Sequence, residues 1–449
     1  MSRDDSAKPP VIIGGGMAGI AAAVALAERG LRPLLLESRP YMGGRTRSFL
    51  HAGTGDEIDN GQHLMMGCYH STLRLLETLG TRNLVAIDPA LRVEFRDADG
   101  SADILSAHTP LPSPLDVLAG MLRLKKLSVA ERFALARLGA RLVISSPTER
   151  ETVSDYLRRL GQSERACARL WDPIVIATLN TPPKIASARL FATVMRRAFL
   201  GRGDDSHLAF PLAGLSRLIE PAERYIAERG GRIVTGATVE RIEREGNEFR
   251  IGLKDGEMIS TERLIAAVPA RAIARIMSDI DIPGSIAIAG TSLASAPIVS
   301  LYLWYDAPLD HLPKFAALIG TNVQWMFNRR RITGERNDRY PGLLSCTISA
   351  AFEESAASGA DIAIMADREL RGAFPEIGAA RLLDTLVIKE KQATFAATPD
   401  AEAVRPPART VLPGFYLAGD WTATSLPATI EGAVQSGYAA ANALLADGG

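Results

Sequence analysis

The glycine-rich run from Gly14 to Gly19, with the sequence GGGMAG, constrains this chain more than any other part of it. The run follows a short apolar stretch, residues 11–13, and opens an alanine-rich segment that ends at Gly30. This order predicts a strand, a tight turn and a helix. Gly14 permits the sharp turn, Gly16 permits a pyrophosphate to approach the backbone, and Gly19 permits close packing of the helix on the strand.

The start of this helix, at Met17 and Ala18, predicts a site for phosphate groups. Free N–H groups at a helix start point at the phosphates, and the helix dipole favours negative charge there. A second apolar stretch ends at Glu37, 18 positions after Gly19, where a carboxylate can accept hydrogen bonds from ribose hydroxyls. A carboxylate in this place disfavours the 2′-phosphate of NADP. Although glycine-rich turns are common, the flanking strands and Glu37 together predict a dinucleotide site.

A second flexible turn, Gly43-Gly44-Arg45, follows Glu37 and Ser38. It is either an ordinary surface loop or a second phosphate contact. Its place directly after the ribose-binding strand favours the phosphate contact, and a nicotinamide cofactor needs no such element. The two turns together favour FAD as the cofactor.

Length and composition set outer limits on the function. A chain of 449 residues is long enough for two domains, and its 51 basic and 51 acidic residues balance, so nothing indicates a nucleic-acid partner. The three cysteines, Cys68, Cys167 and Cys346, form no C-x-x-C pair, so we expect a reducing compartment and no metal site. The first ten residues are polar, and no apolar run approaches the roughly 20 residues that span a bilayer, so we expect a cytoplasmic protein.

Residues 59–63, with the sequence DNGQH, and residues 414–437 carry a specific resemblance. Together with the two glycine turns they resemble the FAD-dependent amine oxidase and phytoene desaturase superfamily. Residues 59–63 are similar to its hydroxysqualene dehydroxylase branch, and the similarity continues at residues 171–173, 179–183 and 389–396. The resemblance covers the whole chain.

The resemblance implies an α/β fold like that of amine oxidases. A Rossmann-like, doubly wound FAD-binding domain is expected to be interrupted by an α+β substrate domain. We expect the FAD-binding domain to comprise residues 1–80, 205–285 and 390–449. The substrate domain is expected to comprise residues 81–204 and 286–389.

The resemblance also implies where the cofactor lies. Gly61, Gln62 and His63 form a turn that passes beside the flavin ring, although a histidine taken alone is more often structural. Val239 presents its backbone to the adenine. The C-terminal motif supplies the other expected contacts, which are Gly419 and Asp420 at the ribityl–pyrophosphate region and Ile430 and Ala433 at a helix start that points at the flavin.

The implied reaction is the reduction of hydroxysqualene to squalene by reduced FAD, in squalene and hopanoid synthesis. Hydroxide is a poor leaving group, so a general acid or a polarising donor is expected beside its oxygen. His63, Lys391 and Glu431 are the candidates, because by resemblance their motifs run beside the flavin. For Lys391 an ordinary exposed lysine is the alternative. No motif identifies the partner that reduces the flavin.

Three other functions fit the same resemblance. A carotenoid-type desaturase or isoprenoid oxidase uses this fold in the oxidative direction, and an amine oxidase is a further alternative. A GDI-like lipid-binding escort shares the architecture without flavin chemistry. The intact Glu37, Gly44, Arg45 and Asp420 argue against the escort.

Residues 115–143 are expected to form two helices with an excess of basic residues. Ser128 and Glu131 make a capping box that predicts the start of the second helix. These helices are either a solvated basic edge or a monotopic contact with anionic lipid at the inner face of the cell membrane. A C30 isoprenoid substrate that hardly dissolves in water fits the second alternative. The basic residues are Arg123, Lys125, Lys126, Arg132, Arg137 and Arg141, against Asp116 and Glu131.

Overall fold

The computed structural model describes residues 8–107, 111, 113–201, 203–278, 280 and 284–447.

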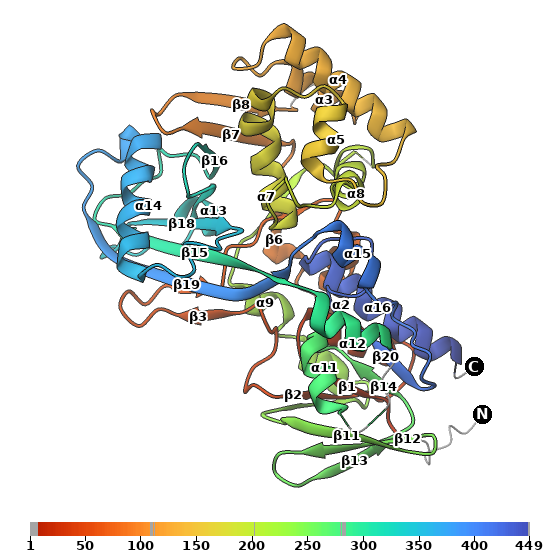
Figure 1. Cartoon of the computed structure of the whole chain (residues 1–449). Coiled ribbons are helices and arrows are strands. Elements are labelled where there is room, and N and C mark those ends of the chain that lie inside the picture. The colour runs from red at the N-terminus through yellow and green to blue at the C-terminus, as the bar shows by residue number, and fades with distance from the viewer. Residues whose placement is uncertain are drawn as a thin grey trace.

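One half of the molecule, in the lower part of Figure 1, is built on a parallel sheet with the strand order β10-β2-β1-β14-β20. Each adjacent pair of strands in it is parallel. The doubly wound α/β class predicted from the sequence is confirmed. The strands come from the beginning, middle and end of the chain: β10 (Arg232–Thr235), β2 (Leu34–Glu37), β1 (Val11–Ile13), β14 (Leu264–Ala266) and β20 (Phe415–Leu417).

Both faces of this sheet are buried. Ile12, Leu35 and Ile265 face one side, where they pack against α1 (Met17–Glu28) and α16 (Ile430–Asp447). Burial on both faces explains why the strands are continuous apolar runs without polar alternation. The opposite face is covered by β11 (Val239–Glu245), β12 (Glu248–Leu253), β13 (Met258–Thr261), α11 (Ala270–Ile276) and α12 (Gly284–Ser292).

The other half contains a mixed sheet with the order β19-β15-β18-β17-β16-β7-β8. β16 and β7 pair in parallel, and the other neighbours are antiparallel. One face packs against α14 (Gly359–Ala373). The strands are β19 (Leu382–Phe395), β15 (Ser295–Tyr305), β18 (Gly342–Ser349), β17 (Trp325–Asn328), β16 (Phe315–Ile319), β7 (Arg92–Asp97) and β8 (Ala102–Ser106).

A helical layer lies at the top of the molecule in Figure 1, beyond the mixed sheet. The predicted capping box is present in it, because Ser128 Oγ accepts from the N–H of Glu131 and the Glu131 carboxylate accepts from the N–H of Ser128. Its helices are α3 (Leu115–Leu122), α4 (Val129–Ile144), α5 (Val153–Arg159), α6 (Glu164–Ala166), α7 (Asp172–Leu179) and α8 (Ala188–Phe199).

The long pair β15 and β19 joins the two halves (Figure 1). β15 begins shortly after α12, and its first residue, Ser295, pairs with Phe395 at the end of β19. The chain then passes through α15 (Pro399–Val404) to β20 of the parallel sheet. Shorter elements complete the fold, and α2 (His70–Leu79) and α10 (Ala222–Ala227) pack with α1 and α16 in the half that contains the parallel sheet. The others are β3 (Ser48–Leu50), β4 (Glu57–Asp59), β5 (Met65–Met66), β6 (Val85–Ile87), β9 (Leu208–Pro211), α9 (Leu215–Ile219) and α13 (Arg329–Thr333).

A buried ion pair ties the segment before β4 to the mixed sheet. Arg330 on α13 donates to both carboxylate oxygens of Asp56 at 2.8 and 2.9 Å, and Trp304 Nε1 donates to Asp56 at 2.7 Å. Burial alone raises the pKa of the Asp56 carboxyl, but the hydrogen bonds from Arg330 and Trp304 outweigh it and lower the pKa below its ordinary value. The carboxylate therefore stays ionised, and the pair fixes the start of the segment that contains residues 59–63.

Candidate active site

The first glycine turn packs as tightly as its sequence predicts, except at one position. A Cβ at Gly14, where φ is +107°, would lie 2.5 Å from the carbonyl oxygen of Ala267. A Cβ at Gly19 would lie 1.9 Å from the carbonyl oxygen of Gly14. A Cβ at Gly16 would meet nothing within 4 Å. Gly14 and Gly19 therefore serve the packing of strand on helix, whereas Gly16 borders open space.

The N-terminus of α1 lies beside this open space and has no side-chain cap. Its N-cap residue is Gly16, and no side chain accepts a hydrogen bond there. Met17 and Ala18 in the first turn are buried. Buried N–H groups at a helix start need acceptors, and phosphate oxygens are suited to this place. The site therefore fits the diphosphate of a dinucleotide.

Glu37 is fixed above the glycine turn at the carboxyl end of β2. Its carboxylate accepts from the N–H of Gly15 at 2.6 Å, from the N–H of Arg39 at 2.8 Å and from Ser38 Oγ at 3.1 Å. The carbonyl oxygen of Glu37 also accepts from the N–H of Ala237 at 2.9 Å. This hydrogen bond brings the start of β11, and with it the predicted adenine contact, next to the predicted ribose contact.

The second glycine turn touches the first. The N–H of Gly43 donates to the carbonyl oxygen of Gly15 at 2.8 Å, and a Cβ at Gly44 would lie 3.4 Å from Gly16 Cα. Arg45 follows, and its guanidinium reaches the far end of the chain. The open space at Gly16 is thus bordered by a cation as well as by the start of α1.

Arg45 and Asp420 form an ion pair of 2.7 Å between Nη2 and Oδ2, although 375 positions separate them. Arg45 also donates to the carbonyl oxygen of Ala393 on β19. The N–H of Gly419, next to Asp420, donates to Ser436 Oγ on α16 at 2.7 Å. Thus the N-terminal turns, the end of β19 and the C-terminal motif converge at one place.

The start of α16 also lies here, with Ile430 buried and Ala433 half-buried. The helix approaches α1 very closely, since a Cβ at Gly437 would lie 2.2 Å from the carbonyl oxygen of Ala18. Small residues in α16 therefore serve helix packing at Gly437. The flavin contacts expected of Ile430 and Ala433 stay predictions.

Residues 59–63 form a turn that both halves of the molecule hold in place. Asp59 is fully buried, and its Oδ1 accepts from Ser48 Oγ at 2.7 Å and from the N–H of Leu215 at 2.9 Å. A Cβ at Gly61 would lie 3.1 Å from Ser300 Oγ on β15.

Arg329 on α13 is a residue that the sequence reasoning missed. It is only 2% exposed, and its Nη1 lies 3.1 Å from Gln62 Oε1 and 3.4 Å from Asp59 Oδ2. It therefore fixes the Gln62 side chain and balances the buried Asp59 carboxylate. In the sequence it stands in a run of three arginines, residues 329–331, which is typical of a surface segment.

His63 ends this turn and is half-buried. Burial lowers the pKa of the His63 imidazole, the Asp59 carboxylate opposes this effect, and the Arg45 guanidinium lowers the pKa further. The net direction is downward from 6.5, so the ring is neutral at neutral pH. A neutral ring can donate one N–H hydrogen bond, but it is not an imidazolium acid.

The other two catalytic candidates lie in different surroundings. Lys391 is exposed on β19, two residues before Ala393, whose carbonyl oxygen binds Arg45. Glu431 is buried, and its carboxylate accepts from the N–H of Ser71 at 3.0 Å and from the N–H and hydroxyl of Thr72, both at 2.8 Å. Glu431 thus caps the N-terminus of α2, which supports a structural role. Catalysis by either residue stays a prediction.

The cysteines do not lie in a reactive arrangement. Burial raises the pKa of the Cys68 thiol to about 12 and that of the Cys167 thiol to about 11, so both thiols stay protonated. Within the described parts of the chain, no group of three or more His, Cys, Asp or Glu residues could hold a metal ion.

Comparison with known proteins agrees with this geometry. Residues 17–445 match the family described as flavin containing amine oxidoreductase. The chain belongs to this family. Its members carry flavin, and the residues assembled around Gly16 are consistent with a flavin dinucleotide.

Three named relatives are similar to this chain along nearly its whole length. Hydroxysqualene dehydroxylase of Rhodopseudomonas palustris is 31% identical over 447 residues, covering 97% of this chain and 98% of the relative. Hydroxysqualene dehydroxylase of Zymomonas mobilis is 28% identical and covers 97% and 98%. 15-cis-Phytoene desaturase of an Oncidium hybrid cultivar is 27% identical and covers 97% of this chain and 78% of the relative.

Solved structures share the fold at lower identity. An oxidoreductase from Methanosarcina mazei has a TM-score of 0.74 at 16% identity and covers 95% of this chain and 98% of its own. A variant of putrescine oxidase has a TM-score of 0.72 at 16% identity, with coverage of 98% and 99%. These similarities confirm the amine oxidase-like fold.

Gly16 and Gly19 should respond differently to substitution. Gly16→Leu should fold like the cofactor-free wild-type protein, because the added side chain has room, but it should purify without flavin colour because it fills the place of the diphosphate. Gly19→Ala should fail to fold, since its Cβ would collide with the carbonyl oxygen of Gly14. Absorbance near the flavin bands and circular dichroism measure the two effects. A fully yellow Gly16→Leu protein would contradict the assignment.

Glu431→Gln tests whether the carboxylate is a cap or an acid. Replacing one acceptor oxygen by an NH2 group leaves a buried donor of α2 without a partner, so we expect a loss of about 1–2 kcal/mol in the free energy of unfolding. Flavin content and the rate of the reductive step should change less than tenfold. A rate loss above a hundredfold at unchanged stability would assign Glu431 to the chemistry instead.

Proposed function

We propose that this protein binds FAD and reduces hydroxysqualene to squalene. The observation that carries the proposal is the similarity to hydroxysqualene dehydroxylases along nearly the whole chain. The site supports FAD through the uncapped start of α1, the ribose-binding position of Glu37 and the cation Arg45. We further propose that the two halves correspond to the FAD-binding and substrate domains with the boundaries expected from the sequence.

The residues around the glycine turns would hold the cofactor extended. The start of α1 and Arg45 would bind the diphosphate, Glu37 the ribose and Val239 the adenine. The turn from Gly61 to His63 and the start of α16 would border the flavin ring. When bound, reduced FAD supplies a hydride. In the overall reaction the alcohol takes up one hydride and one proton, and it gives one hydrocarbon and one water.

His63 is suited to orient the alcohol. Because the pKa of its imidazole is lowered, the ring is neutral and offers an N–H group that can hydrogen-bond to the departing oxygen. Such a donor polarises the C–O bond without carrying a charge into an apolar site. Lys391 remains the candidate source of the proton, because it lies two residues before Ala393, whose carbonyl oxygen binds Arg45.

We propose that the face of the mixed sheet opposite α14 lines the part of the site that holds the apolar substrate. The face of the mixed sheet opposite α14 carries a cluster of aromatic rings, in which Phe315 stacks on Trp325 at 5.0 Å and meets Phe210 edge-on at 6.1 Å. An apolar enclosure keeps water from recapturing the cation left when the hydroxyl departs. The oxidative alternatives, a carotenoid-type desaturase or isoprenoid oxidase, use the same walls, and phytoene desaturases are among the relatives.

The direction of hydride transfer can be tested in one turnover. The enzyme is photoreduced anaerobically in D2O, so that exchangeable flavin hydrogens are replaced by deuterium, and is then given hydroxysqualene. Squalene with one deuterium at the former carbinol carbon is expected, and the flavin should become oxidised in the same period. The absence of turnover, together with desaturation of a polyene by the oxidised enzyme, would overturn the proposal in favour of a desaturase.

His63 should influence the rate as a neutral donor. His63→Leu removes the N–H group and should lower the single-turnover rate about a hundredfold or more, whereas His63→Gln keeps a donor and should lose less. Because burial and the Arg45 guanidinium lower the pKa of His63, any change of rate caused by its protonation is expected at a lower pH than for an ordinary histidine. A wild-type step near neutral pH that His63→Gln abolishes would show that the imidazolium is the active form.

A further inference from the structure

The outer face of α4 is an exposed apolar stripe. Phe133 is 72% exposed, Ile144 71%, and Val129 and Val143 both 66%. With Ala136 and Ala140 between them, these residues recur at spacings of three and four, so they share one side of the helix. The opposite side packs inward through Leu135, Leu138 and Leu142. Large apolar side chains exposed in a continuous stripe mark a contact surface.

Arginines border the stripe on both sides. With a rotation of about 100° per residue, Arg132 lies at one edge, and Arg137 and Arg141 lie at the other. The connection that leads into α4 adds Arg123 and Lys125. Among the described residues, none of these five cations has a carboxylate partner, and Glu131, the acidic residue of α4, pairs with Arg165. Arg132 and Arg137 donate to the backbone carbonyl oxygens of Leu124 and Leu160. Arg123, Lys125 and Arg141 are therefore the cations that can reach outward.

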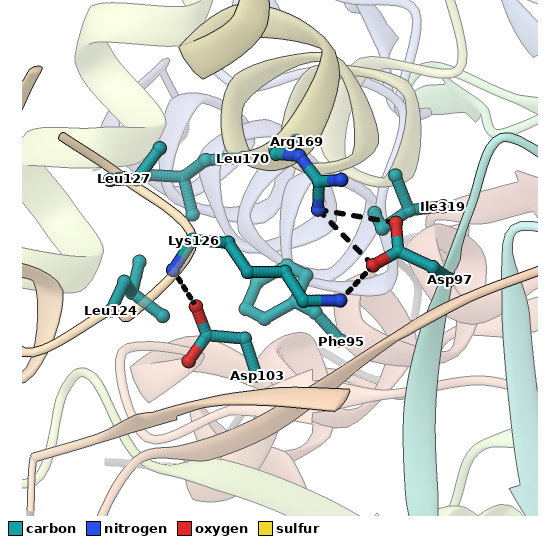
Figure 2. Close-up of a pocket in the computed structure, with 9 residues that line it drawn as sticks. All are labelled: Phe95, Asp97, Asp103, Leu124, Lys126, Leu127, Arg169, Leu170 and Ile319. Carbon is teal, nitrogen blue, oxygen red and sulfur yellow. Dashed lines mark hydrogen bonds and ion pairs between the residues drawn. The ribbon is translucent and has the colours of Figure 1, made fainter. Parts of the chain in front are cut away.

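Lys126 does not belong to this surface, although the sequence places it beside Lys125. Its ammonium group turns inward and binds Asp97, which Arg169 also contacts at 3.2 Å (Figure 2). Burial raises the pKa of the Asp97 carboxyl, but hydrogen bonds from Lys126 and Arg169 outweigh it and lower the pKa. The backbone N–H of Lys126 donates to Asp103. The expectation that Lys126 contacts lipid is therefore wrong.

We propose that the outer face of α4 docks on the surface of an anionic lipid bilayer. The apolar stripe would enter the boundary between headgroups and acyl chains, and Arg123, Lys125 and Arg141 would extend to the lipid phosphates. The helix lies at the outer end of the molecule, remote from the parallel sheet (Figure 1). A membrane can therefore contact the protein at this end without meeting the parallel sheet. In the part of the chain that the structure describes, no helix is long and apolar enough to cross a membrane.

A second copy of this chain fits the surface less well. A symmetric dimer would bring two stripes together, and with them two sets of cations without carboxylate partners, which repel each other. An anionic bilayer offers acyl chains to the apolar stripe and phosphate groups to the cations beside it. The inference rests on this surface alone, so it does not depend on which isoprenoid the active site takes.

Vesicle sedimentation tests the inference with the flavin-loaded protein. Vesicles of phosphatidylcholine alone are compared with vesicles that also contain phosphatidylglycerol. Wild-type protein should bind the anionic vesicles more strongly. The triple variant Arg123→Gln, Lys125→Gln and Arg141→Gln should lose roughly a hundredfold in partition to anionic vesicles, at about fivefold per cation. The double variant Phe133→Ser and Ile144→Ser should lose binding to both kinds of vesicle.

Two control variants separate this face from a general surface effect. Val411 is exposed in the half that contains the parallel sheet, and Arg224 on α10 is exposed there too. Val411→Ser and Arg224→Gln should bind vesicles like the wild type. Wild-type binding that is equal with and without phosphatidylglycerol, or stripe variants that sediment like the wild type, would overturn the inference. A wild-type dimer that the stripe variants dissociate without a change in vesicle binding would assign the face to a second copy and also overturn it.

Turnover of detergent-solubilised hydroxysqualene distinguishes the two proposals. The stripe variants should reduce it at the wild-type rate, because no residue of α4 belongs to the site. Vesicle binding by a wild-type protein that fails to reduce hydroxysqualene would leave the membrane inference standing and contradict the proposed function. Turnover by a wild-type protein that binds no vesicles would support the proposed function and overturn the membrane inference.

Discussion

The buried start of α1 is the constraint on which the rest of the structure depends. No side chain caps its N–H groups, so water or a ligand must supply their acceptors. The glycines around the start of α1 have different structural roles. Gly14 and Gly19 bring helix and strand together, and Gly437 brings α16 onto α1, so that the second glycine turn and the C-terminal motif can border the same space. Binding of a dinucleotide is therefore built into the packing of the parallel sheet.

The turn at residues 59–63 depends on the other half of the molecule. Its buried carboxylate, Asp59, is balanced by Arg329 on α13, and the preceding Asp56 is balanced by Arg330. Removing one partner of a buried pair leaves an uncompensated charge, which is much costlier than losing a surface ion pair. The two adjacent arginines therefore set the position of the turn relative to the mixed sheet. The geometry of the active site is thus a property of the contact between the halves.

Local motifs explain which parts could be predicted. The glycine turns, Glu37 and the Asp420 motif were recognisable because spacing within a few residues determines their geometry. Arg329 was not, because its role depends on Asp59 and Gln62, some 270 positions away, and its sequence neighbours are also arginines. Lys126 and Glu431 also have contacts that depend on residues distant in the sequence. The sequence context of Lys126 indicated a lipid contact, but Asp97 binds its ammonium instead. The contact of Glu431 with the start of α2 could not be read from the sequence either, and its catalytic role stays a prediction.

The arrangement of charge also explains how such a site can stay dry. The buried charges nearest the turn are neutralised in pairs, Asp59 by Arg329, Asp56 by Arg330 and Asp420 by Arg45. The surrounding walls can then be aromatic and aliphatic without leaving an isolated ion among them. In such low-dielectric surroundings a hydrogen bond is stronger than in water, and an imidazolium without a partner loses its proton and becomes neutral. Burial and the Arg45 guanidinium keep His63 neutral, and the pairing of the other charges allows apolar walls to exclude water from a cationic centre.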